Sequence, residues 1–114
     1  FRSTVFYIDE FSEEINSGGV SGYLYYYGTH FEKLATAFET IDSKESLILL
    51  ECIKNKFPRN SVPKNIDSMQ NTLDKLEDKG IDFETEDDMY FNEYENIIFE
   101  KLQEYILNNK KHFR

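Results

Sequence analysis

Few residues in this 114-residue chain could act as nucleophiles or metal ligands. It holds one cysteine, Cys52, and two histidines, His30 and His112. A cysteine nucleophile needs a basic partner, and structural zinc needs four cysteine or histidine ligands, more than this chain has. Cys52 follows the apolar run 47–50, so we interpret it as a small buried core residue. His30 stands at the start of a predicted helix, as a surface or cap residue. We therefore predict no catalytic site and no cofactor.

One pattern resembles a calcium-binding loop. Counted from Asp82, the EF-hand positions 1, 3, 5, 7 and 12 are all acidic: Asp82, Glu84, Glu86, Asp88 and Glu93. Position 6 of such a loop needs glycine for its sharp turn, and here it is Asp87. Because an acid-rich stretch matches this spacing by chance, we predict no metal site.

The acidic residues gather in one third of the chain. Residues 74–104 hold twelve Asp and Glu against three Lys, a net charge of −9, which equals the net charge of the whole sequence. Residues 80–100 hold eight acids and no base, and these eight are the candidate partner-binding residues: Asp82, Glu84, Glu86, Asp87, Asp88, Glu93, Glu95 and Glu100. The four at 84–88 are expected to lie off the apolar stripe. Such charge disfavours nucleic acid and anionic membranes as ligands, and favours a basic protein.

The composition indicates a folded protein. Aromatic residues make up 16% of the chain, which argues for a packed core rather than a disordered acidic tail. No run of 18 apolar residues and no signal-peptide pattern is present, and a lone cysteine suits a reducing compartment, so we expect a cytoplasmic protein. Phe1 is not methionine and already falls in a helical pattern. We expect residues 1–114 to form a single acidic helical domain that lacks its natural N-terminus.

Apolar residues recur at every third or fourth position through most of the chain. This periodicity predicts an all-α fold, a compact bundle of five to six helices. The predicted helices cover 1–16, 30–41, 44–57 with an N-cap at Ser43, a stretch from Ile66 to near Gly80, and a final stretch from Tyr94 to Ile106. The tyrosine-rich segment 21–28 is predicted as a short helical piece. Thr85 with Asp88 fits a capping box.

The segment Asn16-Ser17-Gly18-Gly19 is predicted to end the first helix in a left-handed cap, because asparagine and glycine tolerate positive φ. The chain must then reverse so that Tyr23 and Leu24 pack back on the helix. We therefore assign Asn16, Gly18 and Gly19 a structural role.

This corner and the aromatic run that follows it, Tyr23-Leu24-Tyr25-Tyr26-Tyr27-Gly28, resemble the signature of the bacterial DNA-mimic protein family. Phe57-Pro58 at the end of a helix and Asp88-Met89-Tyr90 in the acidic C-terminal part are similar too, in the same order. The resemblance implies an all-helical fold and a binding activity, in which an acidic face takes the place of duplex phosphates on a DNA-binding protein. Departures from the family pattern fall at packing or turn positions: Ser17, Val20, Gly22 and Tyr27.

The charge layout agrees with such a role. As a helix, residues 80–100 would span ~30 Å, over which one DNA strand carries about nine phosphates, close to the eight acids counted above. We predict a non-enzymatic, protein-binding module whose partner is a basic DNA-binding protein such as a transcription factor. Two alternatives stay open: an immunity or inhibitor protein against a basic toxin or nuclease, and a helical domain whose acids only keep it soluble. The sequence predicts no oligomeric state.

Overall fold

The computed structural model describes residues 2–110 and folds them into helices joined by short turns, with no strand in that range. The predicted all-α class is confirmed. Phe1, Lys111 and His112 lie outside the described residues. The described helices are α1 (Arg2–Tyr27), α2 (Phe31–Thr40), α3 (Lys44–Lys54), α4 (Ile66–Asp78), α5 (Glu84–Met89) and α6 (Glu95–Asn108), with 3₁₀ turns η1 (Gly28–His30) and η2 (Pro58–Asn60) and a π-turn η3 (Tyr90–Tyr94).

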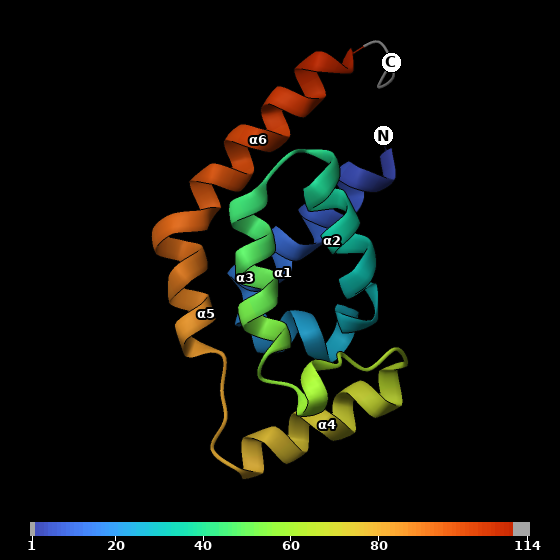
Figure 1. Cartoon of the computed structure of the whole chain (residues 1–114), viewed down its shortest axis with the longest axis vertical. Helices are drawn as coiled ribbons and strands as arrows, with labels where there is room; N and C mark the ends of the chain where they lie inside the picture. The colour runs from blue at the N-terminus through green and yellow to red at the C-terminus, as the bar shows by residue number, and fades with distance from the viewer. Residues whose placement is uncertain (1, 111–114) are drawn as a thin grey trace.

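The helices form a body with one projecting arm (Figure 1). α2 and α3 lie side by side in front of α1, and α4 crosses one end. α5, η3 and α6 run along one side as a continuous C-terminal arm (residues 84–108), and α6 projects past the body at the end opposite α4. The radius of gyration is 14.2 Å, against about 13 Å for a compact chain of this length. The molecule is therefore somewhat more extended than a compact chain of this length.

α1 is bent at Gly19, which joins two helical segments. Gly19 has φ 72° and ψ −175°, a region open essentially to glycine alone. The positive φ predicted for this corner is confirmed at Gly19. The predicted positive φ is wrong for Gly18, because the first helix continues past its predicted end at Asn16 and includes Gly18 as an exposed helical residue. The buried residues of α1 fall on both sides of the bend: Ile8, Phe11, Ile15, Val20, Tyr23 and Leu24.

Phe11 lies at the centre of the core. Its ring meets those of Tyr23, Phe38 and Tyr90 edge to face, with centroid distances of 5.0, 5.8 and 5.9 Å. Aromatic pairs of this geometry contribute about 0.5–1.5 kcal/mol each beyond the area they bury. Because Phe38 belongs to α2 and Tyr90 to η3, one ring of α1 ties the arm to the α1–α2 pair.

α3 ends at Lys54, three residues before its predicted end. Ser43 is the N-cap residue as predicted, but its hydroxyl pairs with the Ser46 hydroxyl at 2.6 Å rather than with a backbone N–H. The predicted burial of Cys52 is wrong, since its side chain is only half-buried. The buried face of α3 passes beside it, through Ser46, Leu49, Leu50 and Ile53.

α4 confirms the predicted helix after Pro63. The Asn65 side chain caps it by accepting a hydrogen bond from the Ser68 N–H at 2.9 Å. Gly80, with φ 77°, lies just past its end, in the position where helices commonly terminate on glycine. No helix of the described range is long and apolar enough to cross a bilayer.

The C-terminal arm buries a residue at every fourth position: Glu86, Tyr90, Tyr94, Ile98 and Leu102. In an unbroken α-helix at ~100° per residue, such a stripe would drift by about 160° over its length. The π-turn η3 inserts one extra residue and reduces the drift to about 60°, so that all five side chains reach the body. The predicted final helix is confirmed. The capping box at Thr85 is wrong, because α5 already begins at Glu84, whose N–H donates to the Asp82 carboxylate.

Candidate functional site

The eight predicted partner-binding acids divide into exposed and engaged residues. Exposed are Asp82, Glu84, Asp88, Glu93 and Glu100, and Glu95 is half-buried. From residue 84 onward they follow the C-terminal arm (Figure 1). Because this segment is helical rather than a loop, the EF-hand-like spacing places its acids on different sides of the arm. In residues 2–110, no three His, Cys, Asp or Glu side chains gather closely enough to hold a metal ion.

Glu86 is engaged within the fold. It is 4% exposed, and its carboxylate lies 2.6 Å from Lys56 Nζ. The Lys56 ammonium also donates to the backbone carbonyl of Asp82 and sits 5.4 Å from the centre of the Phe83 ring. This pair fastens the start of α5 to the turn after α3. The expectation that Glu86 lies off the apolar stripe is therefore wrong, because an ammonium partner lets a carboxylate take a core position.

Asp87 holds the bend in α1. Its Oδ1 accepts a hydrogen bond from the Val20 N–H at 2.7 Å, so a residue of α5 supplies the N-cap for the second segment of α1. A Cβ on Gly19 would lie 2.9 Å from the other carboxylate oxygen. Burial raises the pKa of Asp87 above its usual value, although the Val20 hydrogen bond opposes the rise. Asp87 is thus half-buried and occupied, rather than a free surface charge.

A groove of about 310 Å³ runs between α1 and α6. Asp9 and Glu95 face it from the two helices, and burial raises the pKa of Asp9, as does the neighbouring charge of Glu13. We call it the acidic groove, and its lining residues are Asp9, Ser12, Asn16, Tyr90, Glu95, Asn96, Ile98, Phe99 and Leu102. Counting charge along the sequence missed it, because Asp9 and Glu13 lie far from the acidic third. Their spacing of four along a helix was the available signal.

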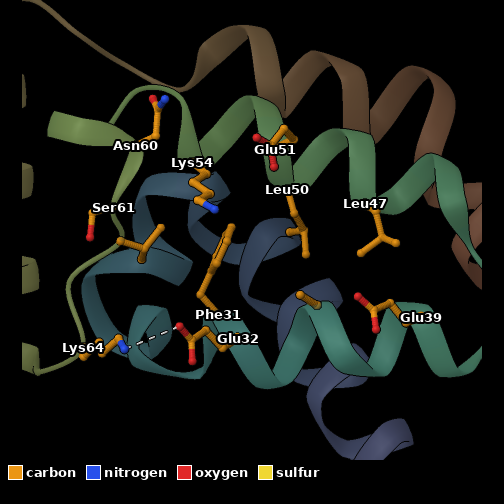
Figure 2. A pocket seen from close by; sticks show the side chains of 12 residues that line it. Phe31, Glu32, Glu39, Leu47, Leu50, Glu51, Lys54, Asn60, Ser61 and Lys64 are labelled. Atoms are coloured by element: carbon orange, nitrogen blue, oxygen red, sulfur yellow. Dashed lines mark ion pairs between the residues drawn. The ribbon is translucent and has the colours of Figure 1, made fainter.

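A second hollow, a slot of about 530 Å³, opens between α2 and α3 (Figure 2). Leu47 and Leu50 point into it from α3, and Phe31 forms part of its apolar wall. Glu32 and Lys64 form an ion pair of 3.8 Å at its rim, and both are so exposed that the pair contributes little stability. The twelve residues that line the slot include no histidine and no cysteine, so it presents no nucleophile–base pair of that kind.

His30 contacts α1. Its Nδ1 lies 2.7 Å from the Glu10 carboxylate, and its ring meets that of Tyr7 edge to face at 5.3 Å. It directly precedes α2, as predicted, although its side chain makes no capping hydrogen bond to that helix. The histidine thus ties the start of α2 to α1.

Comparison with known proteins places the chain by family. A family model described as DMP19-like protein matches residues 2–109, which is nearly the whole sequence. No curated protein and no solved structure matches the chain.

Proposed function

The chain belongs to the DMP19-like protein family, the family of DNA-mimic proteins, and from this we propose that it binds a basic DNA-binding protein in the place of DNA. Its activity is binding rather than catalysis. The observation that supports this best is the C-terminal arm, on which exposed carboxylates follow one another with no lysine or arginine between residues 80 and 100. A basic cleft shaped for phosphates meets a comparable row of negative charge there.

The spacing of charge along the arm is close to that of a DNA strand. The stretch from Glu84 to Glu100 spans ~25 Å as a helix, over which one strand carries about seven phosphates. With Glu86 and Asp87 engaged in the fold, five carboxylates remain on this stretch: Glu84, Asp88, Glu93, Glu95 and Glu100. The arm therefore offers somewhat fewer charges than the phosphates it would replace.

The test is affinity capture from native lysate at low and at high salt, followed by competition with duplex DNA. Exposed charges act over ~8–10 Å at physiological ionic strength, so capture should weaken steeply as salt rises. A captured DNA-binding protein should also be released by duplex DNA. If the amount of captured protein changes neither with salt nor with added DNA, the proposal is wrong. If the captured protein is a nuclease or toxin rather than a transcription factor, the result supports the inhibitor alternative.

Two matched variants separate the arm from general acidity. The first neutralises three exposed acids of the arm by Glu84→Gln, Asp88→Asn and Glu93→Gln. The second neutralises three exposed acids elsewhere by Glu39→Gln, Glu51→Gln and Asp67→Asn, and loses the same charge. The arm variant should lose capture and the control should keep it, with the association rate affected more than the dissociation rate. Equal loss in both variants would refute a role for the arm.

A further inference from the structure

We propose that the acidic groove between α1 and α6 receives an arginine side chain of the basic partner. This inference rests on the proposed function, and it adds a specific recognition element to the nonspecific charge of the arm. The groove holds two carboxylates, of Asp9 and Glu95, on facing helices, and its volume of about 310 Å³ suits one long side chain. A guanidinium group carries five N–H donors in fixed directions, so it can pair with one carboxylate of the groove and still donate to another acceptor.

The carboxylates of the groove are free to take such a ligand. None of the nine lining residues is basic, and within residues 2–110 neither Asp9 nor Glu95 forms an ion pair. Glu13 adds a third negative charge, which repels that of Asp9. A cation that enters relieves this repulsion. The side-chain amide oxygens of Asn16 and Asn96 provide further acceptors around the same space, whereas the Ser12 side chain is hydrogen-bonded to Tyr90.

Phe99 favours arginine over lysine. Its ring is 62% exposed although it lines the groove, which is a large apolar surface to leave in water. A guanidinium stacks on an aromatic face while its edge stays hydrogen-bonded to carboxylates, whereas a strongly hydrated ammonium does so less well. The groove thus combines an aromatic surface with two carboxylates, and no other exposed acid of the arm lines it.

The experiment uses the whole chain and two capped tripeptides, acetyl-Gly-Arg-Gly-amide and acetyl-Gly-Lys-Gly-amide, in NMR titrations at low salt. The arginine peptide should shift the side-chain amide signals of Asn16 and Asn96 and the ring signals of Phe99, and should bind more tightly than the lysine peptide. Asp9→Asn with Glu95→Gln should weaken its binding about tenfold, the effect of losing two such ion pairs. Phe99→Leu should reduce the arginine-over-lysine preference roughly two- to fivefold.

The matched control is Glu100→Gln with Glu104→Gln, which removes the same charge from exposed positions of α6 outside the groove. If the control weakens arginine binding as much as the groove variant, or if both peptides bind equally to the parent, the inference is wrong. Titration with protamine, an arginine-rich DNA-binding protein, distinguishes failure of the groove inference from failure of the proposed function. If protamine binds in a salt-sensitive way but does not shift the signals of Asn16, Asn96 and Phe99, only the groove inference is wrong. If protamine does not bind at low salt, the groove inference and the proposed function are both wrong.

Discussion

The two adjacent glycines of α1 should respond in opposite directions to the same substitution. Gly19→Ala places a Cβ in a backbone region that is nearly closed to other residues, which costs about 1–3 kcal/mol. It also brings that Cβ to 2.9 Å from an Asp87 oxygen. Moving the carboxylate away weakens the cap on Val20, for about 1 kcal/mol more. We expect Gly19→Ala to lower the free energy of unfolding by about 2–4 kcal/mol.

Gly18→Ala is the internal control. Gly18 is helical and exposed, and a Cβ there would meet nothing within 4 Å. Because alanine restricts the unfolded chain more than glycine does, this change should raise the free energy of unfolding by about 0.5–1 kcal/mol. Urea unfolding followed by circular dichroism at neutral pH measures both variants.

The share of the penalty that comes from Asp87 is measurable by a double-mutant cycle. With Asp87→Ala as the background, no carboxylate is left to be displaced, so Gly19→Ala should cost about 1 kcal/mol less than in the parent. A penalty unchanged in that background would show that the backbone conformation alone requires glycine. If Gly18→Ala proves the more damaging variant, or if both variants unfold with the parent, the assignment of the bend to Gly19 is refuted.

Three further changes test the contacts of the arm and of α3. Lys56→Met should lower the free energy of unfolding by about 3 kcal/mol, because it leaves the buried Glu86 carboxylate unpaired, and adding Glu86→Leu should recover most of the loss in urea titrations. Asp87→Asn keeps an oxygen for the Val20 N–H and removes the titration. Folding raises the pKa of Asp87, so the folded state binds the proton more tightly than the unfolded state. The parent should therefore gain stability relative to this variant as pH falls through the folded pKa, with the full gain below pH 3.8, and should lose the gain as pH rises. Equal pH profiles of stability for parent and variant would contradict the raised pKa. Half-buried Cys52 should be labelled stoichiometrically by a thiol reagent under native conditions, but more slowly than in urea. Mass spectrometry measures the labelling, and complete protection of the native protein would show that the Cys52 side chain is buried.

The helices were predictable because their apolar residues repeat at helical spacing. The apolar stripes of α4 and of the final helix could be identified from local sequence alone, without knowing what each helix packs against, and both helices are confirmed. The resemblance carried by Gly18-Gly19 and the tyrosine run is confirmed as well, since the family model covers residues 2–109. Local pattern and motif were sufficient for the fold class and the family.

The roles of individual acids were not predictable in the same way. Glu86 and Asp87 look like their neighbours in sequence, and only their distant partners, Lys56 and Val20, distinguish them. The spacing of four from Glu86 to Tyr90 was a hint that Glu86 shares the buried stripe, but an unbroken helix would have rotated it away. The π-turn that restores the stripe has no clear local signature. The facing of Asp9 and Glu95 likewise depends on how α6 lies against α1.

The hydrogen bond between Val20 and Asp87 spans 67 positions of the chain, which bears on the order of folding events. The packing of α1 on α2, as between Phe11 and Phe38, joins elements that are close in sequence, whereas the cap at the bend requires the closure of a longer loop and the docking of α5. We therefore expect the bend to be completed late on the folding pathway. Substitutions of Asp87 should act mainly on the unfolding rate and leave the refolding rate nearly unchanged. On this expectation, the long-range cap affects the kinetic lifetime of the native state more than its rate of formation.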